Sequence, residues 1–178
     1  MAGVAVGDVN GDGAPDVVTL ISGNSHYSKL RVYPGDGAGG LRSPVVYDVL
    51  DVPENVRVAD INGDGRQDVV ITHSGWLTLS VLEQLPNGTL DTPKLFDAPY
   101  EVSEGGLLVT DINGDGRLDV VMGNTVSLQM PPAAQQASIA SVGGMQLGSP
   151  SQASAASGEA VRSAPAALGI GWRKLRRL

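Results

Sequence analysis

Short apolar stretches separated by turn-forming residues run through the first part of the chain. Residues 17–21 (Val-Val-Thr-Leu-Ile) are a β-branched run, and residues 30–33 (Leu-Arg-Val-Tyr) alternate between apolar and polar positions. A β-branched run suits a buried strand, and a period of two suits a strand with one buried face. Clusters of Gly, Asn, Asp and Ser mark the turns between them. The pattern predicts strands at 3–9, 17–21, 30–33 and 43–48.

The same strand pattern returns about fifty residues later, as in a repeat protein. Leu79-Ser80-Val81 follows Leu30-Arg31-Val32 by 49 positions, and Pro93-Lys94-Leu95-Phe96-Asp97 follows Pro44-Val45-Val46-Tyr47-Asp48 by the same interval. A third unit opens with residues 107–110 and a further apolar run at 120–122. The sequence therefore predicts an all-β fold of repeated units, each about four strands long: residues 1–50, 51–103 and a partial unit at 104–123.

Each unit carries the same nine-residue segment, Asp-x-Asn-Gly-Asp-Gly-x-x-Asp, between its first two predicted strands. We number its residues as positions 1 to 9 and name the copies loop 1 (residues 8–16), loop 2 (60–68) and loop 3 (111–119). Ca²⁺ prefers roughly six to eight oxygen ligands. Side chains at positions 1, 3, 5 and 9 and the backbone carbonyl of position 7 supply such oxygens. The candidate metal ligands are Asp8, Asn10, Asp12, Ala14 and Asp16; Asp60, Asn62, Asp64, Arg66 and Asp68; and Asp111, Asn113, Asp115, Arg117 and Asp119.

The composition of the loops selects among metals and among loop types. The chain has no cysteine, and no histidine lies within the loops, which favours Ca²⁺ over Zn²⁺ or Cu²⁺. An EF-hand needs an acid at position 12, where the three copies carry Thr19, Ile71 and Met122. Plain hairpin turns are the alternative, since Asn-Gly and Asp-Gly both form them. Hairpin turns do not require carboxylates at positions 1, 5 and 9, so we expect up to three Ca²⁺ ions.

On these residues the chain resembles the FG-GAP or VCBS-type repeat of integrin-α-like β-propellers. The resemblance covers residues 3–50, 54–100 and 105–123, and it lies in the nine-residue loop, the following Val-Val and the later Leu-x-Val. It implies a partial β-propeller of about two and a half four-stranded blades, in which each loop joins the first two strands and binds Ca²⁺ through the residues named above. So few blades cannot close a ring, so further blades or self-association are expected.

Charge and composition divide the chain near residue 124. Residues 1–123 carry 18 Asp/Glu and 7 Lys/Arg, a net charge of −11, which argues against nucleic acid as a partner. Residues 124–178 carry one acid and five bases, a net charge of +4, and are rich in Ala, Ser, Gly, Gln and Pro. Such a segment buries too little apolar surface to offset its ordering entropy. Residues 124–178 are therefore predicted to be a low-complexity, disordered tail.

The sequence also bears on where the protein works. No stretch has the roughly 20 apolar residues of a membrane-spanning helix. No secretory signal precedes residue 3, and a repeat that begins there indicates either a piece of a longer protein or an incomplete gene model. Cytosolic Ca²⁺ is too scarce for sites of about 10⁻⁴–10⁻³ M affinity, so an extracellular or cell-surface location is expected.

The function class follows from the loops and from the lack of catalytic motifs. His26 and His73 stand alone, without a cluster of catalytic partners. The leading hypothesis is a non-catalytic, calcium-binding repeat module for adhesion or for binding a protein or carbohydrate ligand, whose identity the sequence leaves open. The alternative is an accessory propeller fragment of a Ca²⁺-dependent extracellular enzyme acting on polysaccharide or lipid. A catalytic motif elsewhere in the protein would favour the alternative.

Overall fold

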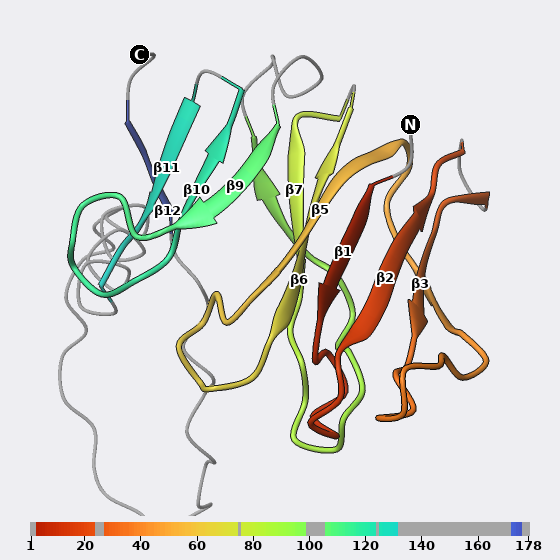
Figure 1. Ribbon diagram of the computed structural model, residues 1–178. Coiled ribbons are helices and arrows are strands. Elements are labelled where there is room, and N and C mark those ends of the chain that lie inside the picture. Colours follow the sequence, from red (N-terminus) through yellow and green to blue (C-terminus); the bar gives the residue numbers. More distant parts are fainter. Residues whose placement is uncertain are drawn as a thin grey trace, which may run out of the picture. The chain divides into compact units, whose positions relative to one another are not determined.

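Three four-stranded sheets make up the fold in the residues that the computed structural model describes, which are 3–23, 27–74, 76–98, 106–123, 125–131 and 172–175 (Figure 1). Sheet 1 contains β1 (Val4–Gly7), β2 (Asp16–Ile21), β3 (Lys29–Tyr33) and β4 (Val45–Asp48). Sheet 2 contains β5 (Pro53–Ala59), β6 (Asp68–His73), β7 (Thr78–Leu82) and β8 (Lys94–Asp97). Sheet 3 contains β9 (Leu107–Thr110), β10 (Asp119–Met122), β11 (Thr125–Gln129) and β12 (Trp172–Leu175).

Within each sheet the strands pair in chain order, as expected for propeller blades. We call sheets 1, 2 and 3, each with the loops that connect its strands, the first, second and third blade. The first two strands of each sheet are antiparallel, and the pair that closes on the loop is Gly7 with Asp16, Ala59 with Asp68, and Thr110 with Asp119. Each nine-residue loop therefore connects two neighbouring strands, as the sequence predicted. The acid at position 9 is in every case the first residue of the second strand.

The first two sheets share one hydrophobic core. Strand β5 of sheet 2 contacts β1 and β2 of sheet 1, and β9 of sheet 3 contacts β5. All six residues of β6 are buried, whereas only alternate residues of β2, its counterpart in sheet 1, are. Sheet 2 has a neighbouring sheet on both sides, through the contacts of β5. The core residues that join the first two sheets are Val9, Val18, Leu20, Leu30, Val32, Val56, Val69, Ile71, Leu82 and Leu90. Val9 belongs to loop 1, so this loop is anchored in the core between the blades.

The third sheet extends beyond the expected boundary at residue 123. The sequence predicted a partial unit at 104–123 followed by a disordered tail at 124–178, but β11 and β12 lie within that tail. The boundary was misplaced because the turn is short: Met122 pairs directly with Thr125, whereas Ile21 pairs with Lys29 and His73 with Thr78. The third strand therefore begins earlier than the repeat interval indicates. The rest of the predicted tail, residue 124 and residues 132–171 and 176–178, lies outside the described residues.

Candidate metal centre

Two left-handed glycines turn the backbone of each loop. In loop 1 they are Gly11 and Gly13, with φ of 76° and 83°. The same positions in the other loops repeat these angles: Gly63 (76°), Gly65 (84°), Gly114 (75°) and Gly116 (81°). A residue with a Cβ atom is strained in this region, which explains why positions 4 and 6 are glycine. The turn brings the loop N–H groups round toward the side chains at positions 1, 3 and 5.

Those side chains accept hydrogen bonds from the backbone of their own loop. Asp8 Oδ1 and Oδ2 accept from the N–H groups of Gly11 and Gly13 at 2.7 and 2.9 Å. Asn10 Oδ1 accepts from Asp12 N at 2.8 Å, and Asp12 Oδ1 from Ala14 N at 2.9 Å. The corresponding bonds recur in loops 2 and 3 between 2.8 and 3.0 Å. The three loops therefore share one scaffold, in which the oxygen-bearing side chains curl over the loop.

The acid at position 9 has a second role, because it ties the loop to the third strand of the same blade. Asp16, Asp68 and Asp119 are each 0 % exposed. One carboxylate oxygen accepts from the N–H of position 2, at 3.0 Å from Val9, 3.2 Å from Ile61 and 3.0 Å from Ile112. The other accepts from an N–H at or just beyond the end of the third strand: Gly35 at 3.0 Å, Gln84 at 2.8 Å and Gln129 at 2.9 Å.

Burial perturbs the acidity of these groups. It raises the pKa of Asp68 to about 6, with further contributions from the negative charges of Asp64 and Glu83, while the N–H groups of Gln84 and Ile61 act in the opposite direction. Burial likewise raises the pKa of Asp16. A nearby cation would oppose both shifts, since it stabilises the ionised carboxylate.

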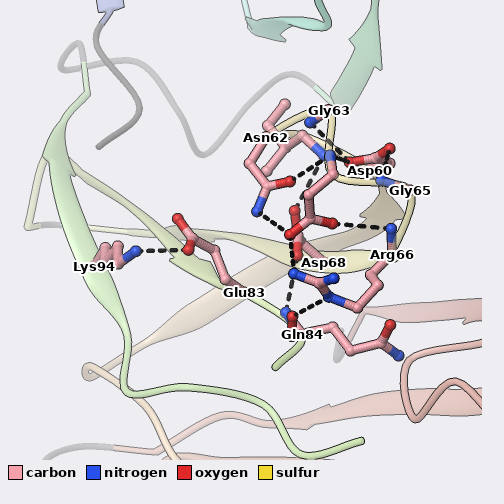
Figure 2. A network of polar contacts seen from close by, with 11 residues as sticks. Asp60, Asn62, Gly63, Gly65, Arg66, Asp68, Glu83, Gln84 and Lys94 are labelled. Carbon is pink, nitrogen blue, oxygen red and sulfur yellow. Dashed lines mark hydrogen bonds and ion pairs between the residues drawn. The ribbon is translucent and has the colours of Figure 1, made fainter. Parts of the chain in front are cut away.

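An arginine pairs with the position-5 carboxylate of every loop. In loop 2, Arg66 at position 7 forms an ion pair with Asp64 (Figure 2), and Arg117 pairs with Asp115 in loop 3. Loop 1 has Ala14 at position 7, and Arg42 pairs with Asp12 instead, at 3.3 Å. Loop 1 thus recruits its arginine from outside the loop. A positive charge at this carboxylate is therefore common to all three copies.

The ligand chemistry of each loop fits a calcium ion, while the carboxylates are held apart. Among the described residues, no three acidic or histidine side chains come together in an arrangement that would hold an ion. The carboxylates bind loop N–H groups and an arginine instead. A carboxylate oxygen that accepts one hydrogen bond keeps a further lone pair. Both oxygens of Asp8 accept one bond each, whereas in Asp60 and Asp111 only Oδ2 does, because Oδ1 accepts from two N–H groups. Every position-1 carboxylate therefore keeps an oxygen for a cation, whereas the position-5 carboxylates must exchange their arginine for the ion.

Sequence reasoning missed the glutamines that link neighbouring blades. Gln67 and Gln84 of sheet 2 hydrogen-bond to Asp8 of loop 1, and Gln129 of sheet 3 to Ile61 of loop 2. The signal was present, because Gln84 lies just after the third strand of its unit and Gln129 is the last residue of the third strand of its own. It becomes visible only when residues 125–129 are recognised as that strand. A cleft of about 720 Å³ lies beside these contacts, lined among others by Asn10, Arg66 and Asn87.

The family comparison agrees with this architecture. The FG-GAP-like repeat matches the chain twice, over residues 8–71 and 60–122. A T-cell immunomodulatory protein homolog of Plasmodium yoelii yoelii is 26% identical over 132 residues, which is 65% of this chain and 19% of that protein. The chain thus spans about a fifth of the length of this relative. A structure of the Photorhabdus luminescens Tc holotoxin pore aligns with a TM-score of 0.47 and 22% identity, covering 73% of this chain and 6% of that one.

The described residues contain no helix long and apolar enough to cross a membrane.

The two repeat matches together run from residue 8 to residue 122 and include all three loops. They account for more than half of the sequence, and the chain belongs to the FG-GAP-like repeat family.

Proposed function

We propose that this chain is a non-catalytic, calcium-binding repeat module of an extracellular or cell-surface protein, used for adhesion or for binding a protein or carbohydrate. The observation that carries the proposal is the threefold recurrence of one loop scaffold. Each loop has oxygen-bearing side chains at positions 1, 3 and 5 turned over its backbone, and a buried acid at position 9. Oxygen-only ligands of this kind suit a hard cation such as Ca²⁺.

The role of the ion in this proposal is structural. Three carboxylates in nine residues repel one another, and a divalent cation converts that repulsion into attraction. The loop joins the first two strands of a blade, and its ninth residue binds the end of the third. Metal bound there stabilises the folded blade, because the unfolded chain has no preformed site.

The extracellular assignment rests on calcium availability and on the relative. Sites of about 10⁻⁴–10⁻³ M affinity fill only where Ca²⁺ is abundant. The relative's name, a T-cell immunomodulatory protein homolog, fits a protein that acts outside the cell that makes it. An epitope-tagged version of the whole parent protein should be cleaved by protease added to intact cells. Protection from protease until the cells are lysed would contradict this location.

Calorimetric titration of the full chain with CaCl₂ tests the metal sites directly. We expect up to three ions per chain, and we expect the variants Asp12→Ala, Asp64→Ala and Asp115→Ala to lose one ion each. These position-5 residues are partly exposed, with side-chain exposures of 33%, 29% and 27%, so the variants should still fold. An unchanged stoichiometry in all three variants would overturn the assignment.

The adhesive role is tested by binding assays in calcium and in chelator. The immobilised chain should retain glycans or cell-surface proteins from defined panels when Ca²⁺ is present, and should release them when a chelator is added. The triple variant Asp12→Ala/Asp64→Ala/Asp115→Ala serves as the matched control. Equal retention by this variant and the wild type would show that calcium plays no part in recognition.

A further inference from the structure

The second blade holds the peptide groups of Asp8 from both sides. Gln67 Oε1 accepts a hydrogen bond from Asp8 N at 2.7 Å, and Gln84 Nε2 donates one to the carbonyl oxygen of Asp8 at 3.2 Å. Asp8 is position 1 of loop 1, so its side chain is a candidate first ligand. The backbone that aims this carboxylate is thus fixed by residues of the following blade.

Gln84 is itself fixed by loop 2. Its N–H donates to Asp68 Oδ1 at 2.8 Å, and its carbonyl oxygen accepts from Arg66 Nε at 2.9 Å (Figure 2). Gln84 is 2% exposed, so its side chain has little freedom to take another partner. Arg66 and Asp68 of loop 2 therefore fix the backbone of Gln84, and the Gln84 side chain in turn bonds to Asp8 of loop 1.

In the third blade, Gln129 makes the corresponding contacts, with its backbone bonded to loop 3 and its side chain bonded to loop 2. Gln129 N donates to Asp119 Oδ1 at 2.9 Å, and the Gln129 carbonyl accepts from Arg117 Nε at 3.5 Å. Its side-chain Nε2 donates to the carbonyl of Ile61, position 2 of loop 2, at 2.8 Å. In the first blade the equivalent residue is Gly35, which has no side chain to reach outward.

Loop 1 receives more contacts from the following blade than loop 2 does. Loop 1 has both Asp8 hydrogen bonds, and Gly88 of the β7–β8 turn approaches Asn10 so closely that a Cβ atom there would collide with the Asn10 carbonyl. Loop 2 has the bond from Gln129. Within the described residues, no side chain from another blade bonds to the backbone of loop 3.

We propose that Gln67, Gln84 and Gln129 are positioning residues that preorganise loops 1 and 2, each from the blade that follows it. Calcium affinity is then higher for loop 1, which receives more of these contacts, than for loop 2. The inference rests on the proposed calcium binding and adds to it an order and a direction of coupling. Groups that orient metal ligands from outside the first shell contribute about 10–100-fold to affinity. A loop held in place also loses less conformational freedom when the ion binds.

A site-resolved titration of the full chain tests the inference. The amide resonances of Gly13, Gly65 and Gly116, each bonded to the position-1 carboxylate of its loop, report binding at loops 1, 2 and 3 when CaCl₂ is added to ¹⁵N-labelled protein. We expect loop 1 to saturate at a lower Ca²⁺ concentration than loop 2. Gln84→Met removes the donor and keeps the side-chain volume, and it should weaken loop 1 about 10-fold while leaving loop 3 within about twofold.

Two further variants separate positioning from loss of folding. Gln67 is exposed, so Gln67→Ala should fold normally, weaken loop 1 and speed hydrogen exchange of the Asp8 amide even in chelator. Gln129→Met should weaken loop 2 and spare loop 1. Unchanged loop 1 affinity in both Gln67→Ala and Gln84→Met, or equal weakening of all three loops, would overturn the inference alone. If the amide chemical shifts of Gly13, Gly65 and Gly116 in the wild type do not change on addition of Ca²⁺, both the proposed function and this inference are overturned.

Discussion

At the scale of single residues, the acids of one loop have different roles. Asp68 is fully buried and accepts from two backbone N–H groups, whereas Asp64 lies at the surface beside Arg66. The hydrogen bonds of Asp68 stabilise the blade whether or not an ion is bound. The carboxylate of Asp64 is accessible to an ion. Position 9 therefore supports the blade as well as any metal site, whereas Asp64 at position 5 bonds, among the described residues, only within its own loop.

Substituting each acid by its amide should separate these roles. In Asp68→Asn one side-chain oxygen remains for two N–H donors, and the new NH₂ group faces one of them. We expect a loss of about 1–3 kcal/mol in the free energy of unfolding, measured with urea in the presence of chelator. Asp64→Asn, the matched control, keeps an oxygen for the Arg66 N–H and loses the ion pair with Arg66 and the bond from Asn62 Nδ2. These are exposed contacts, so the variant should cost about 0–1 kcal/mol. Equal losses would contradict the distinction.

His73 gives the second blade a pH dependence that does not involve the loops. It is buried, and its ring nitrogens contact the Asp51 carbonyl oxygen at 3.0 Å and the Ser80 hydroxyl. Burial lowers its pKa, although the carbonyls of Asp51 and Leu50 and the Asp51 carboxylate act in the opposite direction. In the unfolded chain His73 protonates below a pH of about 6.5. In the folded state, where its pKa is lower, His73 takes up a proton only at a lower pH.

The sign of the effect follows from proton linkage. Below pH of about 6.5 the unfolded state binds more protons at this residue than the folded state, so the contribution of His73 to stability is present above that pH and is lost as the pH falls. In chelator, the wild type should therefore lose stability relative to His73→Gln between about pH 7 and 5. Parallel pH profiles of the two proteins in urea denaturation would show that His73 is not the group responsible.

At the scale of elements, two equivalent turns differ in the contacts of one glycine, which lies against loop 1 in one turn and in open space in the other. Gly39 of the β3–β4 turn and Gly88 of the β7–β8 turn occupy matching repeat positions, with φ of 92° and 80°. A Cβ atom on Gly39 would meet nothing within 4 Å, whereas one on Gly88 would collide with the Asn10 carbonyl. Both alanine variants carry the left-handed strain, but only Gly88→Ala also forces the turn away from loop 1.

The comparison of these two variants therefore isolates the contact between blades. Gly39→Ala should cost about 1–2 kcal/mol of stability from strain alone. Gly88→Ala should cost more, and its loop 1 amides should shift in the NMR spectrum while those of loop 3 stay in place. Chemical shifts in loop 1 that are identical in the two variants would exclude this contact as a support of the loop.

The elements that the sequence predicted correctly depend on local signals. Alternating apolar residues and the Asp/Gly pattern placed the strands and the loops between them, because both signals lie within about ten neighbouring residues. Strand β11 was missed because its position was extrapolated from the longer turns of the first two units. The glutamine contacts join residues 59, 76 and 68 positions apart, which strand periodicity cannot relate. The metal ligands themselves stay a prediction.

At the scale of the whole molecule, calcium links the stability of the blades to their surroundings. With dissociation constants of about 10⁻⁴–10⁻³ M, about 5 mM free Ca²⁺ stabilises the folded state by about 1–2 kcal/mol per site. Thermal melting of the full chain should therefore shift upward by several degrees in CaCl₂ relative to chelator. Mg²⁺ at the same concentration should shift it less, because Mg²⁺ retains its water ligands. The triple position-5 variant should melt at one temperature in all three conditions. A wild type indifferent to Ca²⁺ would mean that the arginine pairs, rather than an ion, neutralise these loops.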